Sequence, residues 1–100
     1  MKDSIPTKII GFGETLTVEL TDALSSETLG HIDYTNQVIR LSEQYNSKTQ
    51  LSTLIHELIH YVDHFSGMGL EENKIEAMEN GLVALMKLNK QFFKNIIEGL

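Results

Sequence analysis

The 100-residue sequence contains no cysteine. This absence excludes disulfide bonds, Fe–S clusters, thiol nucleophiles and zinc sites built from thiolates. Any metal ion must therefore be bound by histidine nitrogens and carboxylate oxygens. Proline is also scarce, with a single residue, and low-complexity segments and repeats are lacking, which excludes disordered, collagen-like and solenoid proteins.

Basic residues are few: eight Lys and Arg stand against fourteen Asp and Glu, which gives a net charge of -6. Both halves of the chain have this acidic balance, so we do not expect nucleic acid to be a direct partner. No apolar run approaches the roughly 18 residues of a membrane span. Residues 1–8 also lack the charged and then apolar pattern of a signal peptide. We therefore expect a cytoplasmic protein that does not bind a membrane.

The length and the 41% apolar content are those of one small core, so we expect a single domain over residues 1–100. Residues 8–12 and 15–20 are rich in β-prone residues and are separated by a Gly-Glu pair, which predicts a hairpin. Residues 29–34 and 37–42, separated by a Thr-Asn pair, predict a second one. Together they indicate a small, mostly antiparallel sheet.

From residue 47 the apolar residues recur at helical spacing. They are Leu51, Leu54, Ile55, Leu58, Val62 and Phe65. This period predicts a helix over residues 48–64 with an apolar stripe, started by a capping box of Ser47 and Gln50 and ended by the glycines in 66–69. A second helix follows the acidic pair at 71–72 and stops near Asn89.

A third short helix is expected over residues 91–97, with its Phe and Ile side chains closing the core. The fold class that these elements predict is α+β. In this arrangement the sheet packs on the first helix, and the second helix lies alongside it.

The first helix carries the pentapeptide His56-Glu57-Leu58-Ile59-His60, an H-E-x-x-H pattern. It is expected by chance only about 0.02 times in a chain of this composition. Residues four apart lie one turn apart on the same helical face, so both imidazoles can bind one Zn²⁺. Glu57 lies about 100° further round the helix, where it can hold and deprotonate a water molecule. The pattern therefore predicts a zinc site with Glu57 as the catalytic base.

A third protein ligand would leave one coordination position for water. The second helix offers four carboxylates: Glu71, Glu72, Glu76 and Glu79. Two straight antiparallel helices joined by a short loop favour Glu76, because it would face the two imidazoles. The residues alone leave the choice between Glu72 and Glu76 open.

Several segments around the pentapeptide resemble the compact ImmA/IrrE-like zinc metallopeptidases, and more closely a small subgroup encoded by bacteriophages and mobile elements. The similarity covers about residues 29–88 and is specific at the pentapeptide. The segments that carry it are residues 29–33, 37–41, 53–60 and 72–78. The resemblance implies a minimal zincin-like fold in which the second helix completes the metal site. It also implies a cytosolic protein substrate, such as a transcriptional repressor.

In that family a Glu is followed by an apolar residue at +3, a polar or acidic one at +4 and an apolar one at +6. Glu72, Ile75, Glu76 and Met78 match this pattern. The resemblance thus implies Glu72 as the third zinc ligand and Glu76 as a neighbouring carboxylate that could orient an imidazole. Glu79 departs from the family, which usually has a small Ala there, so the packing of the two helices is expected to differ.

Other polar residues receive no catalytic role from the sequence. His64 continues the four-residue spacing, but two helical turns separate it by about 12 Å from His56, too far for both to bind one ion. We expect His64 to face solvent or to lie beside the site. Tyr34, Tyr61 and His31 are candidate electrophiles for a tetrahedral intermediate, although each is more commonly a core or surface residue.

Two functions follow from these observations. The first is a zinc metallopeptidase that hydrolyses peptide bonds of a cytosolic protein. The alternative is a non-catalytic, zinc-stabilised phage or mobile-element protein that binds a host or phage partner. Glu57 favours the enzyme, because a purely structural zinc site has no use for a carboxylate beside an open coordination position.

Overall fold

The computed structural model describes residues 5–100, so the segment 1–8, where we expect no targeting signal, lies partly outside it. Four strands and three helices follow one another along the chain. They are β1 (Lys8–Ile10), β2 (Thr15–Thr21), β3 (Gly30–Asp33), β4 (Val38–Ser42), α1 (Ser47–Ser66), α2 (Glu72–Leu88) and α3 (Lys90–Gly99). The α+β class predicted from the sequence is confirmed.

The sheet has the strand order β1-β2-β4-β3. Strands β1 and β2 pair antiparallel, as do β3 and β4, so both predicted hairpins are confirmed. The two hairpins join through a parallel pairing of β2 with β4, which makes the sheet mixed. Strand β4 takes an interior position because its Ile39 and Leu41 are fully buried, whereas β3 remains at the edge.

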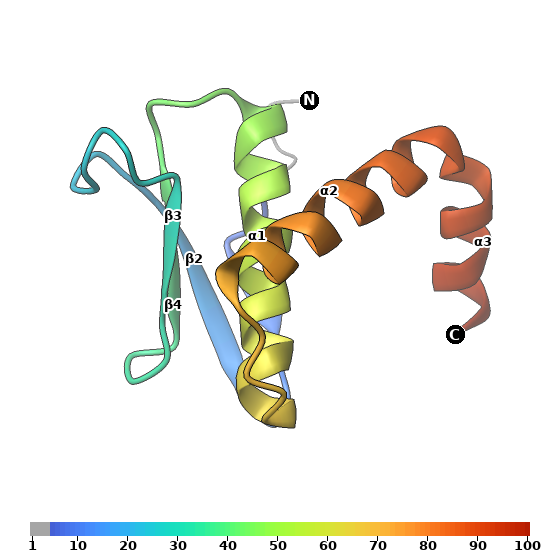
Figure 1. The fold of residues 1–100 in the computed structure, drawn as a ribbon, viewed down its shortest axis with the longest axis horizontal. Coiled ribbons are helices and arrows are strands. Elements are labelled where there is room, and N and C mark those ends of the chain that lie inside the picture. Colours follow the sequence, from blue (N-terminus) through green and yellow to red (C-terminus); the bar gives the residue numbers. More distant parts are fainter. Residues whose placement is uncertain (1–4) are drawn as a thin grey trace.

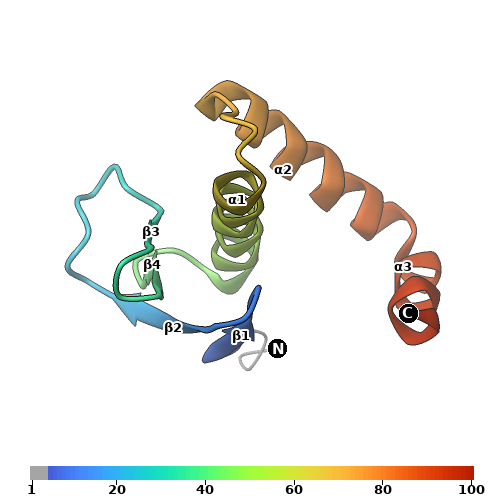
Figure 2. The ribbon, with the colours of Figure 1, turned by 90° about the horizontal axis from the view of Figure 1, so that it is seen from below.

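Helix α1 is the middle layer of the molecule, with the sheet on one side and α2 on the other (Figures 1 and 2). The core lies between the sheet and α1. Its buried members are Leu16, Val18, Ile39, Leu41, Leu54 and Tyr61. Alternate residues of β2 and β4 thus supply one wall of the core, as the period of a half-buried strand requires.

The face of α1 that the sheet covers differs from the predicted apolar stripe. Val62 and Phe65, both assigned to that stripe, are almost half exposed, whereas the polar Gln50 and Thr53 are buried. The buried Gln50 is satisfied because its Nε2 donates to the backbone oxygens of Ser42 and Tyr45, at 3.1 and 2.8 Å. Hydrogen bonding to the chain that enters the helix therefore offsets the burial of a polar side chain.

The start of α1 also corrects a prediction. The N-cap is Asn46, whose Oδ1 accepts a hydrogen bond from the backbone N–H of Thr49 at 2.9 Å. The expected capping box of Ser47 and Gln50 is therefore wrong, because Gln50 bonds to the preceding chain instead. Asn is as good an N-cap as Ser, since a short side-chain oxygen reaches the same free N–H groups.

The C-terminal part of the chain lies away from the core (Figure 1). Ile75 is the one buried residue of α2, and α3 has none. The prediction that α3 closes the core is wrong: Phe92 is 59% and Ile97 is 73% exposed. The reason is the course of α2, which crosses α1 near its own start and then diverges from it. Among residues 5–100, no helix has the length and apolarity that crossing a membrane would require.

Candidate metal centre

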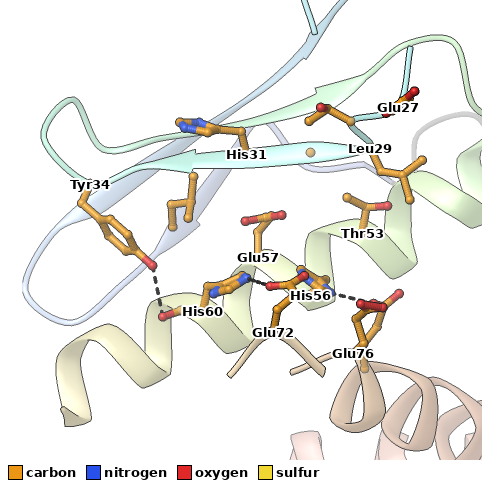
Figure 3. A pocket seen from close by; sticks show the side chains of 14 residues that line it. Glu27, Leu29, His31, Tyr34, Thr53, His56, Glu57, His60, Glu72 and Glu76 are labelled. Carbon is orange, nitrogen blue, oxygen red and sulfur yellow. Dashed lines mark hydrogen bonds and ion pairs between the residues drawn. The ribbon is translucent and has the colours of Figure 1, made fainter. Parts of the chain in front are cut away.

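A cleft of about 590 Å³ lies between the edge strand β3, helix α1 and the first turns of α2. One wall is formed by β3 and the residues just before it, and the floor by one face of α1 (Figure 3). His56, Glu57 and His60 all line this cleft, together with Glu72. The residues of the predicted site are therefore brought to one place.

The two imidazoles converge on one carboxylate. Nε2 of His56 lies 2.8 Å from Oε2 of Glu72, and Nε2 of His60 lies 2.9 Å from Oε1 of the same residue. The ring centroids of the histidines are 5.0 Å apart, as expected for residues one turn apart on α1. These three side chains form a group that could hold a metal ion.

The turn between α1 and α2 positions Glu72. Helix α1 ends at Ser66 and is capped by Gly67, which has a φ of 71° and donates its backbone N–H to the carbonyl of Asp63 at 2.9 Å. This left-handed conformation suits glycine, because a side chain there would be strained. Oδ1 of Asp63 also accepts the N–H of Leu70 at 3.0 Å. The tight reversal brings the first residue of α2 over His56 and His60.

Glu57 points from α1 towards β3 and into the cleft (Figure 3). Its side chain is only 6% exposed, and no hydrogen bond holds its carboxylate among the described residues. Burial raises the pKa of Glu57, although the nearby His56 and His60 partly oppose this shift. A carboxylate with a raised pKa beside a metal-binding group is suited to general acid and base chemistry.

Glu79 makes a contact that the sequence analysis missed. Nδ1 of His56 donates to Oε1 of Glu79 at 2.9 Å, and the hydroxyl of Ser52 donates to the other carboxylate oxygen. Burial lowers the pKa of His56, but the hydrogen bond with Glu79 and the charge of Glu72 outweigh it, so that this pKa is raised. A signal was present: Glu79 follows Glu72 by seven residues, which places both on one helical face.

Glu76, the expected orienting carboxylate, is exposed and lines the wall of the cleft. The contact with Nδ1 of His56 is made three residues later, by Glu79. The side chain that contacts Nδ1 of His56 is therefore Glu79 rather than Glu76.

The remaining candidates lie around the site. The ring of His64 stacks on Tyr34 with a centroid distance of 4.0 Å, outside the group formed by His56, His60 and Glu72. The hydroxyl of Tyr34 donates to the backbone oxygen of His60 at 3.2 Å. His31 is exposed and lines the cleft.

Tyr61 has a structural role away from the cleft. Its hydroxyl donates to Glu14 at 2.8 Å and accepts the backbone N–H of Phe12 at 2.9 Å. Tyr61 thus ties α1 to the loop between β1 and β2.

We compared the chain with models of protein families, with curated proteins and with solved structures, and none of the three comparisons found a match.

Proposed function

We propose that the protein is a zinc-dependent metallopeptidase of minimal zincin-like architecture. In this proposal His56, His60 and Glu72 hold the ion, and Glu57 is the general base. The observation that supports it best is the convergence of both Nε2 atoms on Glu72, next to the buried carboxylate of Glu57.

The donor set favours zinc among the biological metals. Two imidazole nitrogens and one carboxylate oxygen are a common ligand set of catalytic zinc, whereas Mg²⁺ and Ca²⁺ prefer sites made of oxygen atoms alone. Zinc, when bound, supplies an acidified water molecule and polarises a substrate carbonyl. Glu57 would accept a proton from the attacking water molecule and deliver it to the leaving amine.

A peptide substrate fits the position of the cleft beside β3. Within residues 5–100 this strand pairs with β4 on one side only, so its other side has backbone N–H and C=O groups that no described strand pairs with. An extended peptide can add to such an edge as a further strand. The peptide would then lie along the cleft, above Glu57 and the two histidines. We propose a cytosolic protein as the substrate on the resemblance alone.

The second candidate is a non-catalytic protein in which zinc fastens α2 to α1. One observation favours it: Ile75 is the only buried residue of α2, so the ion would add a strong link between the two helices. This function gives Glu57 no task, although placing an acidic residue at only 6% exposure is costly.

A comparison of the wild type with Glu57→Gln tests the proposal. The amide keeps the shape of the side chain but cannot accept a proton, so zinc content and melting temperature should match the wild type while hydrolysis is abolished. Zinc is measured by elemental analysis, and cleavage is measured on a peptide library and a lysate. His56→Ala and His60→Ala should each remove most of the zinc.

Loss of zinc from Glu57→Gln would show that Glu57 is a ligand and that the assigned roles are wrong. If the zinc-loaded wild type cleaves nothing while binding a partner protein, the non-catalytic function is the better one.

A further inference from the structure

The charge of the cleft has one sign. Five glutamates line it, and neither Lys nor Arg is among its lining residues. Lys48 and Lys87 line a separate, neighbouring hollow. Five carboxylates and one divalent ion leave three negative charges in the cleft, so its field attracts cations even with zinc bound. A concave site lined by one sign of charge concentrates ligands of the other sign.

Two of these glutamates have no part in the metal centre or its support. Glu27 precedes β3, and Glu76 lies on α2, on the opposite wall of the cleft. Both lie towards the end of the cleft where Thr53 is found, whereas His31 and Tyr34 lie towards the other end (Figure 3). Both carboxylates are exposed, and neither forms an ion pair among the described residues. The negative charge is therefore unevenly placed along the path of a bound peptide.

Glu57 differs from the other glutamates of the cleft in its burial. The Glu57 residue is only 6% exposed, its carboxylate points into the cleft, and no hydrogen bond from the described residues 5–100 reaches it. Buried polar groups in folded proteins are almost always satisfied by protein, water or ligand. The carboxylate of Glu57 therefore opens onto the cleft and is available there to water or to a ligand.

We propose that the cleft selects extended peptides that carry a Lys or Arg side chain beside the scissile bond. This side chain occupies the end of the cleft that lies between Glu27 and Glu76. This inference rests on the proposed peptidase function and names its substrate class. The basic side chain reaches the two carboxylates while the peptide backbone pairs with β3. The Tyr34 end of the cleft accepts neutral residues, since its lining there is aromatic.

Binding tests this selection separately from hydrolysis. Zinc-loaded Glu57→Gln is titrated with fluorescent eight-residue peptides that are blocked at both ends, so that only side chains differ in charge. Each peptide carries Lys, Met or Glu at one position before or after its centre, and anisotropy gives the affinity. We expect the Lys peptide to bind most tightly and the Glu peptide most weakly, with a difference that shrinks as salt is added. The metal-free wild type, which cannot hydrolyse the peptides, gives a second measurement.

Variants of the two carboxylates locate the effect. Glu27→Gln and Glu76→Gln should each lower the preference for Lys over Met about two- to fivefold, the usual size for exposed charge pairs. Glu98→Gln, on α3 and outside the cleft, is the matched control and should leave the preference unchanged.

Equal binding of Lys and Glu peptides would overturn the inference, as would a preference that survives both substitutions. If basic peptides bind selectively but the wild type hydrolyses none, the selection stands and the peptidase function fails. If the wild type hydrolyses basic and neutral peptides equally well, the peptidase function stands and the selection is wrong.

Discussion

His56 donates a hydrogen bond from Nδ1 to Oε1 of Glu79 over 2.9 Å, and this contact joins α1 to α2 beside the candidate metal centre. A proton held on Nδ1 would leave the lone pair of Nε2 for a metal ion that displaces the proton between Nε2 and Glu72. The hydroxyl of Ser52 holds the other oxygen of Glu79 and so fixes the carboxylate. Groups that orient a metal-binding imidazole in this way usually strengthen metal binding.

Glu79→Ala should therefore weaken zinc binding about 10–100-fold, because the ring of His56 loses its orientation. Affinity is measured by competition with a chelator, and NMR of the His56 ring nitrogens reports the tautomer in the metal-free protein. Ser52→Ala should have a smaller effect in the same direction. Glu98→Ala on α3 serves as control. Unchanged affinity and an unchanged tautomer in Glu79→Ala would show that the contact does not support the site.

Glu72→Gln should lose far more zinc affinity than Glu76→Gln, because only Glu72 lies within 3 Å of both Nε2 atoms. The two residues lie one turn apart on α2 and are both exposed, which makes them a matched pair. Zinc content after dialysis and chelator competition measure the difference. The reverse order would mean that α2 turns its other carboxylate to the ion.

The pH dependence of the metal-free protein follows from His56 and Glu57, whose pKa values are both raised in the folded state. A raised pKa means that the folded protein binds the proton more tightly than the unfolded chain. Protonation of each residue therefore stabilises the folded protein. This stabilisation is complete below the pKa of the residue in the unfolded chain, about 6.5 for His and 4.3 for Glu, and it is lost as the pH rises through the pKa in the folded protein.

We therefore expect the melting temperature of the metal-free protein to fall between pH 5 and pH 8. Stabilisation by zinc should have the opposite pH dependence, because zinc binding displaces protons from the ligands. The increase in melting temperature that zinc causes should therefore grow from pH 5 to pH 8. Thermal scans with and without chelator at four pH values measure both trends. A metal-free protein that becomes more stable from pH 6 to pH 8 would contradict the assigned pKa shifts.

Gly30 and Gly81 form a second matched pair. A Cβ atom at Gly30 would lie 2.6 Å from Cγ2 of Thr53 and 3.2 Å from the carbonyl oxygen of Arg40, so β3 and α1 would have to separate. Gly30→Ala should cost about 1–3 kcal/mol of unfolding free energy. Gly81, within α2, has open space around it, and Gly81→Ala should add about 0.5–1 kcal/mol. Urea unfolding measures both, and a harmless Gly30→Ala would show that β3 and α1 are not in close contact.

The predictions that the structure confirms concern short stretches of chain. Each hairpin depends on two neighbouring strands and the turn between them, so local residue preferences were sufficient to find it. The relation of His56 to His60 follows from the helical repeat alone, because residues four apart on a helix always share a face. The parallel pairing of β2 with β4 joins segments separated by a long connection, and no local pattern specifies it.

The sequence by itself determined the pair of histidines, the intervening Glu57 and the α+β class, since these depend on periods of two and of 3.6 residues. Only the tertiary structure decided that Glu72 meets both imidazoles and that Glu79 supports His56. The physical reason is that these contacts depend on how α2 crosses α1. That crossing is set by the turn at Gly67 and by the burial of Ile75, which act between elements rather than within one.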